Sequence, residues 1–126
     1  MLSQKELELR DELIKDGIAE CKELIGKQSS EAKYFFYEGC LEGLEECKKL
    51  DDLDAYTKRI QELSRAQDRE KMEEDEIMFR IGHLDYEGCE IDSERVQRLH
   101  GIRTEIEFVY KELKEYKQRL NLEAKF

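Results

Sequence analysis

The four cysteines and two histidines are the residues of this chain best suited to metal binding or nucleophilic chemistry. A structural zinc site is typically built from ligand pairs with short spacing, such as Cys-x-x-Cys or Cys-x-x-His. Here Cys40 and Cys47 are seven residues apart, and Cys21 and Cys89 are each isolated in the sequence. Most of these cysteines fall on apolar stripes, where a free cysteine behaves as a small buried hydrophobic residue. We therefore predict reduced core cysteines and expect neither a metal nor another cofactor.

Glutamate pairs at Glu-x-x-Glu spacing are the second feature with catalytic potential. All-α nucleotide pyrophosphohydrolases of the MazG-like kind hold Mg²⁺ between facing helices with Glu-x-x-Glu and a downstream Glu-x-x-Asp. Glu42 and Glu45 supply the first half of that pattern, but the only Glu-x-x-Asp, from Glu8 to Asp11, comes before them. In a chain with 32 acidic residues, spaced glutamates arise from composition alone. A magnesium-dependent pyrophosphohydrolase is therefore a distant alternative, and we expect no enzyme activity.

Helical patterns dominate the rest of the chain. It contains no proline in 126 residues, 43% of its residues are charged, and no segment alternates apolar and polar residues as a half-buried strand does. Ser3 and Glu6 have the spacing of a capping box, which marks the start of the first helix. Whether the third helix is kinked or broken near 73–75 stays open. The expected helices cover about 3–27, 29–50, 52–88 and 92–121.

The strongest pattern lies in residues 99–120, where apolar residues recur at spacings of three and four. This is the heptad repeat of a helix that packs its seam against other helices. Whether the seam is covered within one chain or by a second copy stays open. We predict one domain, 1–126, that is an all-α antiparallel bundle of three to four long helices with coiled-coil-like heptad packing. The seam consists of Leu99, Ile102, Ile106, Val109, Leu113, Tyr116 and Leu120.

A pair of glycines and the apolar stripes predict how the helices pack. Gly39 and Gly43 are four residues apart on the second expected helix, and small residues at this spacing let a neighbouring helix approach closely. The apolar stripes define the side chains that we expect between the helices. The predicted core residues are Ile14, Ile18, Phe36, Cys40, Leu44, Ile60, Leu63, Ile81, Ile102, Ile106, Val109 and Leu113.

The formal net charge is −10, and two acidic segments hold nearly all of it. Residues 38–54 contain seven acids and two bases, and residues 67–76 contain six acids and two bases. Acidic surfaces repel phosphates, so direct binding to nucleic acid or to an anionic membrane is disfavoured, and a protein with a basic surface is the expected partner. The predicted partner-binding residues are Glu42, Glu45, Glu46, Asp51, Asp52, Asp54, Glu70, Glu73, Glu74, Asp75 and Glu76.

The remaining patterns define the expected function. The longest uninterrupted apolar run, residues 34–37, is too short for a transmembrane helix or a signal peptide, so we expect a cytoplasmic protein. Without catalytic motifs, the sequence predicts a small acidic, non-catalytic protein-binding module with an adaptor, regulatory or self-associating role, a homodimer included. The alternative is an acidic nucleic-acid mimic that inhibits a basic nucleic-acid-binding protein, such as a virus- or phage-encoded counter-defence protein.

Overall fold

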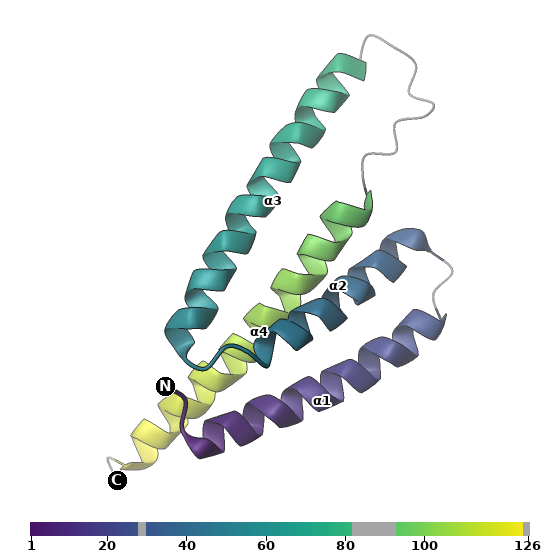
Figure 1. Ribbon diagram of the computed structural model, residues 1–126. Coiled ribbons are helices and arrows are strands. Elements are labelled where there is room, and N and C mark those ends of the chain that lie inside the picture. The colour runs from purple at the N-terminus through teal and green to yellow at the C-terminus, as the bar shows by residue number, and fades with distance from the viewer. Residues whose placement is uncertain (28–29, 82–92, 125–126) are drawn as a thin grey trace.

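The structure is a computed structural model that describes residues 1–27, 30–81 and 93–124; the side chains of residues 73–81, 93, 123 and 124 lie outside the described set. The described residues form four helices, and no strand occurs among them. Successive helices run in opposite directions (Figure 1), which confirms the predicted all-α antiparallel bundle. The helices are α1 (Gln4–Lys27), α2 (Glu31–Cys47), α3 (Leu53–Ile81) and α4 (Ser93–Ala124).

α4 is the central helix, because it packs against each of the other three. Its most extensive contact is with α2, and α3 packs along another side. Figure 1 shows the helices converging at the end where both chain termini lie and diverging toward the opposite end, so that the N-terminal half of α4 lies between α2 and α3. Cys47 and Tyr56, at the turn between α2 and α3, are fully buried, so part of the core lies at the convergent end.

The start of α1 is the capping box that the sequence predicts. The backbone N–H of Ser3 donates to Oε1 of Glu6 at 3.1 Å, and the backbone N–H of Glu6 donates to Oγ of Ser3 at 3.2 Å. These reciprocal bonds satisfy two donors that the first helical turn leaves without a partner.

The connection between α2 and α3 differs from the expected boundaries. α2 ends at Cys47 rather than near residue 50, because the N–H groups of Lys48, Lys49 and Leu50 turn back to carbonyls three residues earlier. Asp52 then caps α3 by accepting a hydrogen bond from the N–H of Ala55 at 2.7 Å. α3 continues unbroken through residues 73–75, and the expected helix end near residue 88 lies outside the described residues.

Most of the predicted core is buried. Among the predicted residues, Ile18, Phe36 and Ile60 are partly buried and pack against the core, and the side chain of Ile81 lies outside the described set. Four further residues are buried in the core: Leu2 and Tyr56, which were not predicted there, and Cys21 and Cys47, which agree with the prediction of core cysteines but not with the list of core residues. The predicted residues found fully in the core are Ile14, Cys40, Leu44, Leu63, Ile102, Ile106, Val109 and Leu113.

Glycines allow α2 and α4 to approach at backbone distance. A Cβ atom placed on Gly43 would lie 2.6 Å from the carbonyl oxygen of Ile102, and one on Gly39 would collide with the backbone of Arg98. Gly101 has the same role on α4, because a Cβ atom placed on it would collide with backbone atoms of α2 around Phe36. The close approach predicted from Gly39 and Gly43 is therefore present.

Among the described helices, none combines the length and the apolar character needed to cross a lipid bilayer.

Candidate functional site

Three acids of the segment 38–54 form a stripe along one face of α2. Glu38, Glu42 and Glu45 follow one another at spacings of four and three, so they share one face of the helix. Glu42 and Glu45 are exposed and Glu38 is partly buried. Glu42 has no ion-pair partner among the described side chains, whereas Glu45 pairs with Lys48 at 3.0 Å.

Other predicted partner-binding acids are engaged within the chain. Glu46 forms a bidentate ion pair with Arg59 of α3. Nε of Arg59 donates to Oε2 of Glu46 at 2.7 Å, and Nη2 donates to Oε1 at 2.8 Å. Such a forked arrangement is the strong form of an arginine–carboxylate contact. It raises the pKa of Arg59, chiefly through the hydrogen bond to Glu46. Glu46 therefore links α2 to α3 at the convergent end.

The remaining predicted acids are divided among several roles. Asp51 lies 3.5 Å from Arg10, Asp52 caps α3, and Asp54 is exposed. Glu70, whose side chain is 15% exposed, forms an ion pair with Arg95 of α4. The predicted acids whose side chains the structure describes are therefore not gathered into one surface. The side chains of Glu73, Glu74, Asp75 and Glu76 lie outside the described residues.

α2 and α3 diverge along the N-terminal half of α4 (Figure 1). Residues of these three helices line a groove with a volume of about 460 Å³. We call it the α4 groove. Leu99 and Ile102 supply its apolar floor. The sequence explains why it stays open: the apolar stripe of α3 stops after Leu63, and the small side chain of Ala66 is what α3 offers at this point. Its lining comprises Glu42, Ala66, Arg69, Glu70, Arg95, Arg98, Leu99 and Ile102.

Charged side chains of both signs form the rim of the α4 groove. Arg98 on α4 donates to Glu38 of α2 at 2.7 Å and also pairs with Glu94 at 3.1 Å. Glu42 on the α2 side and Arg69 on the α3 side have no ion-pair partner among the described side chains. The groove thus combines an apolar floor with two charges, one of each sign, that are available to a ligand.

A second cluster joins α1, α2 and α4 beneath the surface. Cys21, Cys40 and Glu105 place one potential ligand atom each within 4.8 Å of one another. Both thiols are buried, and Glu105 is partly buried. In the described part of the chain, no other group of three or more His, Cys, Asp or Glu side chains is close enough to share a metal ion.

Burial governs the protonation of this cluster. It raises the pKa of the Cys21 thiol to about 11, with a further contribution from the negative charge of Glu105. Burial also raises the pKa of Cys40 well above the usual range of a thiol. The pKa of Glu105 is raised by burial as well, although a hydrogen bond from Cys40 acts in the opposite direction. Without a cation, the thiols are therefore neutral at physiological pH.

Sequence reasoning treated these cysteines as core residues and missed the cluster. The burial of Cys40 was predicted, and that of Cys21 follows from its place on an apolar stripe, but the three ligands belong to different helices. The one local signal is that Glu105 directly precedes the seam residue Ile106, at a heptad position that borders the core. Spacing along the chain could not show that its neighbours would be two thiols.

Comparison of the chain with protein-family models, with curated proteins and with solved structures gives no match.

Proposed function

We propose that this chain is a non-catalytic protein-binding module that holds an amphipathic helix of a partner protein in the α4 groove. The supporting observation is the uneven coverage of the α4 seam. Ile106, Val109 and Leu113 are completely buried by the chain's own helices, whereas Leu99 is only partly buried where α2 and α3 diverge. A helix laid in such a groove completes the bundle by burying apolar positions at helical spacing.

Charge defines the kind of helix that the groove accepts. Glu42 stands on the α2 side next to the partly exposed stripe of Glu38 and Glu45, so a partner helix gains by presenting Lys or Arg there. Its apolar positions then face Leu99 and Ala66. The overall charge of −10 attracts a basic partner over a longer range and raises its association rate.

The nucleic-acid mimic has less support from the same contacts. A surface that imitates phosphates needs rows of carboxylates that are free to meet Lys and Arg of another protein. Among the described predicted acids, Glu46 and Glu70 are held by arginines of this chain, and Asp52 caps a helix. These contacts leave the described surface with mixed charge, which suits a helix with both apolar and charged positions.

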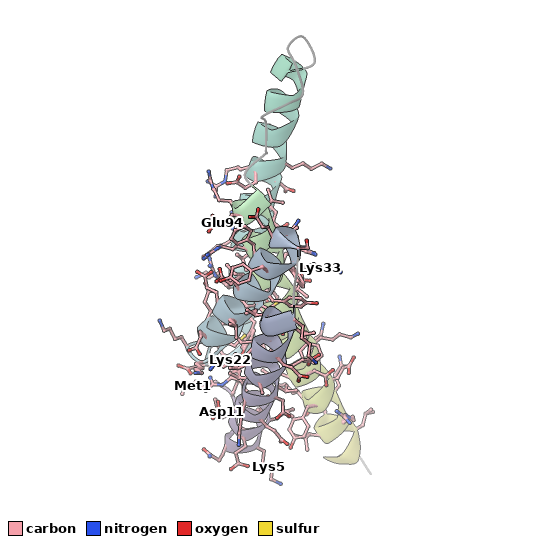
Figure 2. All side chains as sticks on the ribbon, turned by 90° about the vertical axis from the view of Figure 1, so that its right-hand side faces the viewer. Met1, Lys5, Asp11, Lys22, Lys33 and Glu94 are labelled. Carbon is pink, nitrogen blue, oxygen red and sulfur yellow. The ribbon has the colours of Figure 1, made fainter. Side chains whose placement is uncertain are left out.

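Photo-crosslinking from the groove tests this proposal. A photoreactive amino acid is placed at Arg69, on the groove rim, or at Lys22 (labelled in Figure 2), an exposed residue of α1 that does not line the groove. In the source cells we expect crosslinks from position 69 to one partner segment, and none to that segment from position 22. Digestion and mass spectrometry should identify an amphipathic segment with Lys or Arg on its polar side.

A matched pair of charge reversals separates docking from general attraction. Glu42 lines the groove, whereas Glu12 is an equally exposed acid on α1, which does not line it. We expect Glu42→Lys to weaken binding of the identified segment at least about tenfold, the effect of losing roughly 1.4 kcal/mol, and Glu12→Lys to leave it almost unchanged. Equal losses in both variants, or crosslinks only to a second copy of the chain, would contradict the proposal.

A further inference from the structure

The cluster of Cys21, Cys40 and Glu105 has the composition of a metal site rather than of a purely apolar core. Each residue comes from a different helix, and the three ligand atoms lie within 4.8 Å of one another. Cys40 is 1% exposed and Cys21 is 4% exposed. The partly buried carboxylate of Glu105 completes one side of the cluster. Two sulfur ligands and one oxygen ligand therefore converge inside the bundle.

The charged groups that act most strongly on the cluster are the carboxylates of Glu20 and Glu105. Glu105 has no Lys or Arg partner among the described side chains, and the charge that acts on it most is that of Glu20, another acid. A carboxylate removed from water without a cation costs free energy, since burial normally requires a pair or a metal. A core that needed only small apolar side chains would gain nothing from placing Glu105 beside two thiols.

We propose that Cys21, Cys40 and Glu105 bind a divalent metal ion of the zinc class. Zn²⁺ is bound in proteins by cysteine sulfur and by carboxylate oxygen, usually with four ligands in a tetrahedron. With Zn–S bonds of about 2.3 Å, two sulfur ligands of a tetrahedral site stand about 3.8 Å apart. Ligand atoms that already lie within 4.8 Å need to close by only about 1 Å. Three protein ligands leave one position for water.

The ion would cross-link α1, α2 and α4. Binding converts two thiols into thiolates and releases two protons, so the affinity depends on pH. Where both thiols are protonated in the metal-free protein, the apparent affinity should rise by up to about 100-fold per pH unit. The proposed site is independent of the α4 groove, because the two share no residue.

Titration of the whole protein with Co²⁺ under a non-thiol reductant tests the site directly. Co²⁺ takes the place of Zn²⁺ and reports its ligands, because thiolate ligands give a charge-transfer band and a tetrahedral site gives strong visible absorption. We expect one Co²⁺ per chain with both signals, and displacement of Co²⁺ by one equivalent of Zn²⁺. Binding without a thiolate band would show attachment to surface carboxylates and would overturn the proposal.

Substitutions distinguish ligands from neighbouring core residues. We expect Cys21→Ser and Cys40→Ser to abolish the thiolate band. Cys47→Ala is the matched control, because Cys47 is an equally buried thiol of α2 outside the cluster. Cys89→Ser is a second control, because Cys89 lies outside the described residues, and this variant should keep the thiolate band. Loss of the band in Cys47→Ala, or its persistence in Cys40→Ser, would contradict the assignment.

Glu105→Gln keeps the test decisive if a cysteine variant fails to fold. The loss of even an indirect partner of a metal ligand weakens binding by about 10–100-fold, so removal of the ligand itself should weaken Co²⁺ binding at least about tenfold. The same change removes an unpaired, partly buried charge, so the melting temperature of the metal-free protein should rise. A carboxylate with a structural role alone would not give these opposite effects. Unchanged Co²⁺ affinity, or a Cys21–Cys40 disulfide in protein alkylated at lysis, would overturn the proposal.

Discussion

Arg10 shows how one side chain connects segments that are distant in the sequence. Arginine is seldom buried, yet Arg10 is only 8% exposed. Its Nη1 donates to the carbonyl oxygen of Leu50 at 3.1 Å and lies 3.5 Å from Asp51. The guanidinium therefore fixes the start of α1 against the turn between α2 and α3. Nothing in the sequence around residue 10 identifies this contact, because its partners lie 40 residues away.

Arg10→Ala should lower the free energy of unfolding by about 2–3 kcal/mol, because it leaves the carbonyl of the partly buried Leu50 without its donor and removes the buried stem of Arg10. Denaturant unfolding followed by circular dichroism measures this difference. Lys15→Ala is the control on the same helix, since Lys15 is exposed, and its effect should stay within about 0.5 kcal/mol. Similar losses in the two variants would contradict a specific role for Arg10.

Cys47 gives the protein a predictable response to alkaline pH. Burial raises the pKa of its thiol from 9.0 to about 12. Above about pH 9 the unfolded chain loses this proton while the folded chain keeps it, so the free energy of unfolding falls as pH rises toward 12, by up to about 1.4 kcal/mol per pH unit. Below that range the thiol is protonated in both states and its contribution is constant.

Unfolding free energies at about pH 8 and about pH 10 test this response. In Cys47→Ala the decrease between the two values should be smaller than in the unchanged protein, even though the alanine also loses packing at both. The comparison depends on the slope, so a uniform loss of stability does not affect it. An unchanged slope in Cys47→Ala would show that this thiol does not resist ionisation.

At the scale of elements, the contact between α2 and α4 depends on glycine. Because the Cβ position of Gly43 lies 2.6 Å from the carbonyl oxygen of Ile102, an alanine there must push two helix backbones apart. We expect Gly43→Ala to lower the free energy of unfolding by about 1–3 kcal/mol, the usual effect of overpacking a core, despite the better helix propensity of alanine. Gly101→Ala should act in the same direction, because its Cβ would meet the backbone of α2.

Gly26 provides the matched control near the end of α1. No atom outside its own surroundings lies within 4 Å of a Cβ placed there. Gly26→Ala should therefore be neutral or stabilising by up to about 1 kcal/mol, because alanine favours the helix. Thermal unfolding of the three variants side by side gives the order of stability. A destabilised Gly26→Ala together with a neutral Gly43→Ala would reverse our interpretation of the contact.

The elements also show what a sequence can and cannot predict. The capping box of Ser3 and Glu6 and the spacing of Gly39 and Gly43 involve residues within one turn of helix, so local patterns suffice. The end of α2 at Cys47 depends on a turn whose hydrogen bonds compete with one more helical turn, and the heptad stripe gave no sign of it. The cluster around Glu105 depends on how three helices rotate about their axes, which no local spacing specifies.

At the scale of the whole molecule, coverage of the α4 seam predicts the oligomeric state. Ile106, Val109 and Leu113 are completely buried by helices of the same chain, so the centre of the seam needs no second copy. We expect the isolated protein to be monomeric at micromolar concentration. Sedimentation equilibrium measures this directly, and a stable dimer would support the self-associating alternative instead.

The charged surface of the whole molecule was the least accessible to sequence reasoning. Counting acids along the chain defines the segments 38–54 and 67–76, but a count does not show which carboxylates face a cation. Glu46 meets Arg59 and Glu70 meets Arg95 because α2, α3 and α4 lie next to one another. Which charges at the groove are available to a partner therefore depends on how the helices pack, and a count of acids along the chain does not contain this information.

The central position of α4 has a consequence for how the protein folds during its synthesis on the ribosome. The residues of α2 and α3 are synthesised before α4, yet the main packing partner of both helices begins only at Ser93. Contacts such as Gly39 with Arg98 close a loop of nearly 60 residues, and contacts of this kind form late. The nascent chain therefore exposes the faces of α2 and α3 that α4 covers until α4 leaves the exit tunnel. Translation speed and chaperones that bind nascent chains thus affect the yield of this protein more than that of a protein whose neighbouring helices pair as they emerge.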